Sequence, residues 1–135
     1  AMGRVQLAKL PAGNARRGEL TALYRELLAE HTPQISLPFQ EARSQGSYHI
    51  MPVLLPEGMD KLAVMASMKA QGIQTSWHYP PVHTFSIYAK GWQPQVNPLP
   101  LTESVAAREL TLPLYPTMTE EQVHLVVNGL KNLGS

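Results

Sequence analysis

The sequence predicts one α+β domain: a small, mostly antiparallel sheet of about three strands with helices packed on one side, preceded by a long N-terminal helix. Three observations predict it: a helical period within residues 1–31, short apolar segments between turn residues, and a capped amphipathic helix near the end. A length of 135 residues suits a single domain, which we place at 1–135. The composition, 44% hydrophobic and 16% charged, is typical of a globular chain.

The first helix is predicted over residues 11–30, where apolar side chains recur at three- and four-residue intervals. Pro11 suits the first position of this helix, because its missing N–H would be unpaired there anyway. Residues 2–10 can add a further turn or two, kinked at the proline. The following segment, 32–45, contains two prolines and little periodicity, so we expect a loop.

The middle of the chain predicts a strand, a helix and a second strand. The first strand covers residues 47–55, and Pro52 within it indicates a sheet edge or a bulge. The helix covers 59–71 and ends at Gly72. Its expected inward residues are Leu62, Met65, Ala66 and Met68. Residues 73–77 form the second strand, so the three elements make one α+β layer.

Residues 78–101 show no period of a helix or strand, which is typical of a functional or disordered segment. We then expect a short helix over 102–110, capped by Thr102, and a third extended segment over 111–115.

The last helix has the clearest signals. Thr119 and Gln122 form a capping box at its start, and Gly134 suits its end. Its apolar stripe consists of Val123, Val126, Val127 and Leu130. The α+β core is therefore expected over residues 46–135.

Composition excludes several classes of function. Eleven basic against ten acidic residues give a net charge of +1 without a basic stripe, so nucleic acid is not an expected partner. The chain has no cysteine, which excludes disulfides and zinc–thiolate sites. It has neither an apolar run of roughly 20 residues nor a secretory signal, so we expect no membrane span and a cytoplasmic location.

Three ordered segments carry a family resemblance. Residues 3–28 contain GRVQLAKL, NARR and YRELL; residues 72–83 read GIQTSWHYPPVH; residues 110–116 read LTLPLYP, followed by Met118 and Thr119. Together they resemble the DegT/DnrJ/EryC1/StrS aminotransferases. The resemblance implies a fold-type-I enzyme that uses pyridoxal phosphate to transfer an amino group, usually from L-glutamate, to a keto sugar bound as its nucleotide diphosphate.

The resemblance also implies a domain arrangement. Residues 1–31 would form the helix that bridges to a large cofactor-binding domain encoded ahead of Ala1, and the rest would form the small C-terminal domain. The parent is expected to be a homodimer that binds pyridoxal phosphate and a nucleotide sugar. Without the large domain, the apolar face carrying Val5, Leu7 and Leu10 should be exposed.

The chain alone is expected to bind no cofactor and to have no activity, because none of its lysines has the Gly-rich surroundings of the family's cofactor lysine. Three alternatives remain open. The parent could be a sugar dehydratase of the same superfamily, or the domain could serve a non-enzymatic regulatory or binding protein. The chain could also be a free-standing ligand-binding domain.

Candidate site residues follow from the same resemblance. His78, Tyr79, His83 and Tyr88 would line the sugar-nucleotide pocket of the parent, because imidazole and phenol groups suit sugar hydroxyls or a phosphate. The alternative is that His78 caps a strand end by bonding to backbone while Tyr79 packs. A metal site at His78 and His83 is not expected, since their spacing lacks the geometry of a helical pair and no third ligand is evident.

Overall fold

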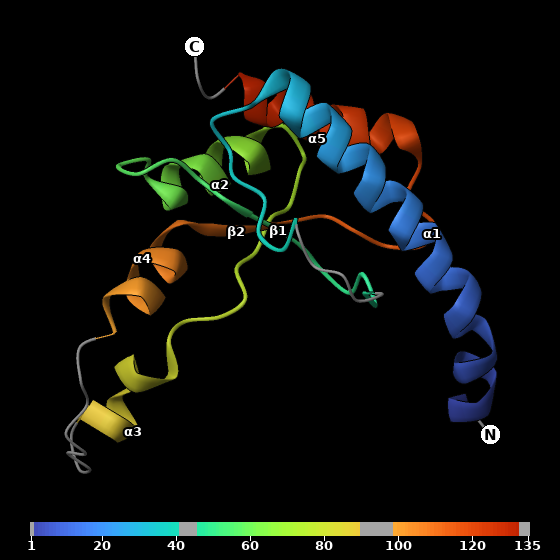
Figure 1. Cartoon of the computed structure of the whole chain (residues 1–135), viewed down its shortest axis with the longest axis horizontal. Coiled ribbons are helices and arrows are strands. Elements are labelled where there is room, and N and C mark those ends of the chain that lie inside the picture. The colour runs from blue at the N-terminus through green and yellow to red at the C-terminus, as the bar shows by residue number, and fades with distance from the viewer. Residues whose placement is uncertain (1, 41–45, 90–98, 133–135) are drawn as a thin grey trace.

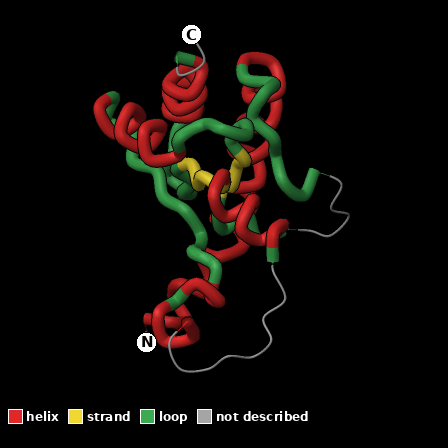
Figure 2. The backbone as a smooth tube through the Cα atoms, turned by 90° about the vertical axis from the view of Figure 1, so that its left-hand side faces the viewer, coloured by secondary structure: helices red, strands yellow, loops and turns green. Residues whose placement is uncertain are grey.

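The computed structural model describes residues 2–40, 46–89 and 99–132, and it confirms the α+β class (Figure 1). Its elements are α1 (Met2–His31), β1 (Met51–Leu54), α2 (Lys61–Ala70), the 3-10 turn η1 (Val82–Thr84), α3 (Ser86–Ala89), α4 (Pro100–Arg108), β2 (Glu109–Leu112) and α5 (Glu120–Lys131). The two strands lie at the centre with helices around them (Figure 2). Within this described part of the chain, every helix is too short or too polar to cross a bilayer.

Helix α1 is continuous from Met2 to His31, so residues 2–10 extend the helix as expected, and Pro11 lies inside it rather than at its first position. A proline inside a helix removes one backbone hydrogen bond, here to the carbonyl of Leu7. Pro11 and Leu7 are both exposed, and water can satisfy that carbonyl, which explains why the helix continues.

The two halves of α1 have different surroundings. The C-terminal half packs against α5 and buries Leu20, Thr21, Tyr24, Leu27 and Leu28. The N-terminal half extends away from the strands (Figure 1). The predicted exposure of its apolar residues is confirmed: Val5 is 55% exposed, Leu7 67% and Leu10 47%.

The sheet is an antiparallel pair of two strands rather than the predicted three. Its register is Met51↔Leu112, Pro52↔Thr111, Val53↔Leu110 and Leu54↔Glu109. A single bridge extends it on each side, Ser36 to Leu54 and Ser76 to Thr111. The predicted strand over 73–77 is thus reduced to one paired residue.

Two residues of the β2 region explain why that third strand stops. With Ser76 opposite Thr111, the next hydrogen-bonded pairs of an antiparallel ladder would be Gln74 with Pro113 and His78 with Glu109. Pro113 has no N–H to donate. The N–H of His78 donates to the side-chain carboxylate of Glu109 (2.9 Å) instead of to a backbone carbonyl. Ladder pairing therefore ends on both sides of Ser76.

Pro52 lies in regular register opposite Thr111, without a bulge. The N–H and the carbonyl of Thr111 both pair with Ser76, at 2.7 and 3.1 Å. Thr111 therefore directs no backbone hydrogen bond toward Pro52, and the missing donor of the proline costs this pair nothing. On its other side, within the residues that the structure describes, β1 pairs only at Ser36, which agrees with the predicted edge position.

Helix α2 begins after the N-cap Asp60 and ends before Gly72, whose φ of +78° confirms it as the left-handed stop. The predicted inward face was half wrong. Val64 and Met68 are buried and Met65 is partly buried, whereas Leu62 and Ala66 are exposed. Lys61 fixes this rotation, because its ammonium group donates to the carbonyl of Ala106 (2.7 Å) at the end of α4.

The remaining elements differ from their predicted bounds. Residues 78–101, expected to be irregular, contain η1 and α3 and the start of α4. Helix α4 begins at Pro100, a proline at the first helical position, rather than at a Thr102 cap. It ends at Arg108, so β2 begins two residues earlier than predicted.

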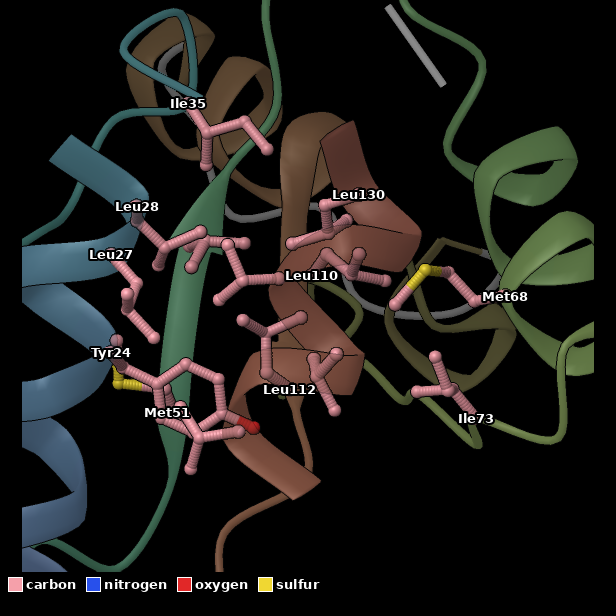
Figure 3. Packing of buried hydrophobic residues seen from close by; sticks show 14 of the residues in the cluster. Tyr24, Leu27, Leu28, Ile35, Met51, Met68, Ile73, Leu110, Leu112 and Leu130 are labelled. Carbon is pink, nitrogen blue, oxygen red and sulfur yellow. The ribbon is translucent and has the colours of Figure 1, made fainter. Parts of the chain in front are cut away.

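Helix α5 confirms its prediction, with a capping box of Thr119 and Gln122 and a buried stripe. Gly134 lies outside the described residues. Figure 3 shows how the core is assembled: Tyr24, Leu27 and Leu28 point from α1 toward the strands, where Leu110 and Leu112 lie. Gly129 lets α5 approach closely, since a Cβ there would lie 3.0 Å from Ile73 Cδ1 and from Met68 Sδ.

Candidate functional site

The site centres on His78, which follows the single bridge at Ser76. Its ring Nδ1 lies 2.8 Å from the hydroxyl oxygen of Thr111. That hydroxyl donates to Oε1 of Glu109 at 2.5 Å, and the backbone N–H of His78 donates to Oε2. His78, Thr111 and Glu109 therefore form one closed network.

Strand alternation brings these groups together. Successive side chains of β2 point to opposite faces, so Leu110 and Leu112 face the helices while Glu109 and Thr111 face the other way. All four are buried. The polar side chains of β2 are thus the ones that contact His78.

The ring of Tyr79 packs edge-on against the His78 imidazole, with ring centroids 4.8 Å apart. Tyr79 is nevertheless 72% exposed, so this contact leaves most of its side chain accessible. The His78 ring likewise bonds to a side chain rather than to backbone. The pair presents an aromatic surface and a ring nitrogen next to it.

His83 and Tyr88 belong to a different part of the structure. His83 Nε2 lies 3.1 Å from Oε1 of Glu103, which ties η1 to α4. Tyr88 is 43% exposed on α3, whose first turn is continuous with η1. Of the four predicted site residues, the described structure joins His78 with Tyr79 and places His83 and Tyr88 on the η1–α3 segment.

Sequence reasoning missed Glu109 and Thr111. The signal was present in the alternation of ELTL, where polar and apolar residues follow a period of two at a strand. We missed Glu109 because we placed it inside the predicted helix over 102–110, where an acidic side chain is expected to face solvent.

The described lysines are not placed to bind a pyridoxal phosphate cofactor. Lys61 is held by Ala106 and lies 5.3 Å from the centre of the Trp77 ring. The others described, Lys9, Lys69 and Lys131, are exposed on helices. Lys90, which we considered the one lysine able to enter a site, lies outside the described residues. Across 2–40, 46–89 and 99–132, no three potential metal ligands cluster.

A groove of about 430 Å³ lies between residues 72–76 and the start of α5, and Tyr115 and Leu125 are among the residues that line it. Tyr24 lies on the other side of Pro113, to whose carbonyl it donates at 2.9 Å. Burial, and secondarily the neighbouring Tyr115, raise the pKa of Tyr24 well above its ordinary value.

Known structures share this arrangement of elements. Over 98% of the chain, DesV from S. venezuelae, solved in complex with a ketimine intermediate, is 32% identical with a TM-score of 0.83. DesI, solved in the presence of its TDP-sugar product, is 29% identical over 97% with a TM-score of 0.86. PseC of Helicobacter pylori, an aminotransferase involved in the biosynthesis of pseudoaminic acid, shares the fold at 22% identity over 96% of this chain with a TM-score of 0.86.

The match covers only part of each of those proteins: 34% of DesV, 33% of DesI and 35% of PseC. The chain thus spans about a third of the length of the solved structures it matches. A sequence model of the DegT/DnrJ/EryC1/StrS aminotransferase family matches residues 1–131, nearly the whole chain. This chain belongs to the DegT/DnrJ/EryC1/StrS aminotransferase family.

Proposed function

We propose that this chain is the small C-terminal domain of a pyridoxal-phosphate-dependent enzyme that transfers an amino group from L-glutamate to a keto sugar nucleotide. The observation that carries the proposal is the family match over residues 1–131. The similarity to DesI, solved with a TDP-sugar product, supports a nucleotide sugar as the substrate.

The described residues provide no binding site for the cofactor, so we assign cofactor binding to a large partner domain. Apolar Val5, Leu7 and Leu10 on α1 would pack against that domain, which removes their exposed surface from water. The assembled enzyme would be a homodimer. On its own the 135-residue chain would be inactive.

Within the enzyme, the chain would contribute to the sugar side of the site. His78 and Tyr79 present a ring nitrogen and an exposed phenol ring next to each other. These groups suit hydrogen bonding and stacking with a sugar. His83 and Tyr88 would line the same pocket more peripherally, because His83 is already paired with Glu103.

The first test compares the chain alone with the same chain joined to its cofactor domain. Each is mixed with pyridoxal phosphate, L-glutamate and a TDP-linked keto sugar. We expect a borohydride-trappable cofactor adduct and amino sugar only with the joined protein. A stoichiometric adduct with the 135-residue chain alone would contradict the proposal.

The second test changes His78 in the joined protein. His78→Gln should lower kcat/KM for the keto sugar roughly 10-fold, about the value of one hydrogen bond to substrate, and leave the half-reaction with glutamate unchanged. His49→Gln, at an exposed histidine, is the matched control. Equal loss in both half-reactions would place His78 outside the sugar side of the site.

A further inference from the structure

The carboxylate of Glu109 is in an unfavourable place for stability. It is buried and follows directly after the last residue of α4, where the partial negative charge of a helix end repels an acid. Both of its oxygens are used, Oε1 by the hydroxyl of Thr111 and Oε2 by the N–H of His78. A buried acid is costly unless its oxygens are hydrogen-bonded, and here one oxygen bonds His78 directly while the other bonds the Thr111 hydroxyl that contacts the His78 ring.

The direction of the hydrogen bonds follows from the number of protons. The Thr111 hydroxyl is the donor to Oε1 of Glu109, so its single proton is used in that bond. The Thr111 oxygen can then only accept from the His78 ring, 2.8 Å away. Nδ1 must therefore carry the ring proton.

We propose that Glu109 and Thr111 are positioning residues that hold His78 as the Nδ1–H tautomer, so that Nε2 is presented as a hydrogen-bond acceptor. The role toward substrate rests on the function proposed above; the tautomer itself does not. A neutral ring of this kind accepts from a hydroxyl and cannot donate to a phosphate oxygen. The geometry thus assigns a sugar hydroxyl, rather than the diphosphate, to His78.

This assignment has a consequence for selectivity. A site that accepts from a substrate hydroxyl disfavours the deoxy analogue, because Nε2 would then lose its partner. The Tyr79 ring packs edge-on against the imidazole and restricts its rotation, which keeps Nε2 in a fixed direction.

The tautomer can be measured directly on the 135-residue chain. Histidine labelled with ¹⁵N is examined by two-bond ¹H–¹⁵N correlation at about pH 8.5, where an ordinary imidazole is neutral. The signal that disappears in His78→Gln identifies the ring. We expect Nδ1 to be protonated and Nε2 unprotonated. Finding the Nε2–H tautomer in the unmodified chain would overturn the proposal, whatever the variants show.

Two variants then separate positioning from structure. Thr111→Val keeps the β-branched shape but removes the hydroxyl, and should shift the tautomer ratio toward Nε2–H by roughly 10-fold. Thr111→Ser restores a hydroxyl and should restore the Nδ1–H form. Thr21→Val, which removes a buried hydroxyl bonded to the carbonyl of Arg17, should leave the ratio unchanged. An unchanged ratio in Thr111→Val would overturn the proposal.

These measurements need neither cofactor nor substrate. If the joined protein fails to aminate a keto sugar, the tautomer result still stands. If the tautomer is wrong while amination is observed, only the positioning role fails.

Discussion

The two faces of β2 are both buried but are stabilised in different ways. On one face, Leu110 and Leu112 contact the apolar residues of α1 and α5 and carry no polar side-chain atom. On the other, Glu109 and Thr111 have their side-chain oxygens satisfied by hydrogen bonds within the network of His78. Burial alone therefore does not distinguish core from site. The two faces differ in what a truncated side chain leaves: a cavity on the apolar face, and hydrogen-bonding groups without a partner on the polar face.

The largest expected effect is on the apolar face. Leu110 is fully buried, so Leu110→Ala removes its contacts and leaves a cavity. We expect the free energy of unfolding to fall by about 2–5 kcal/mol, measured by urea denaturation. A loss below about 1 kcal/mol would mean that this face can close around the gap, contrary to the packing described.

The polar face should be affected next. Glu109→Ala leaves the Thr111 hydroxyl and the His78 N–H without their acceptor, which should cost about 1–3 kcal/mol. The matched control is Glu103→Ala, at an exposed acid paired with His83, with an expected cost of about 0–1 kcal/mol. Equal losses in the two variants would show that burial adds nothing to the Glu109 network.

Tyr24 is a polar exception among the apolar contacts of α1, and its removal should have a smaller effect. Its hydroxyl donates to Pro113, so Tyr24→Phe should cost about 1 kcal/mol near neutral pH. Because the folded-state pKa is raised, the stabilisation is complete below the ordinary pKa of 10.0 and is lost as pH rises above it.

The pH dependence gives a second readout for this variant. Urea denaturation from pH 8 to pH 11 should show unfolding free energies that fall more steeply in the unmodified protein than in Tyr24→Phe. Parallel curves would show that Tyr24 ionises as easily in the folded protein as in the unfolded chain.

Local sequence rules predicted some elements of this fold and missed others. The α5 stripe and the Gly72 stop follow from local rules, and both are confirmed. The third strand could not be predicted to fail, because its two ends depend on Pro113 and Glu109 in the distant β2 region, and Glu109 lies thirty-one positions from His78 in the chain. Local pattern identified His78 and Tyr79 through the family motif. The residues that hold the His78 ring come from a distant strand and needed the register.

The orientation of α2 shows the same limit. Its period was visible, but which side faces inward depends on Val64 and Met68 fitting against α5 and on Lys61 reaching α4. The helical period shows that apolar residues recur along one side of a helix, whereas contacts with other elements decide which side is buried.

The smallest expected effect lies outside both faces of β2, at the exposed start of α5. The pKa of Glu121 is lowered by its own backbone N–H and then by the Thr119 side chain. A lowered pKa gives stabilisation that is present above the ordinary value of 4.5 and is lost as pH falls through the lowered one. The melting temperature of Glu121→Gln should therefore lie slightly below that of the unmodified protein at pH 7. This gap should close as the pH falls below 4.5, while the tautomer of His78 in the neutral range stays unchanged. A gap independent of pH would assign the effect to packing rather than to charge.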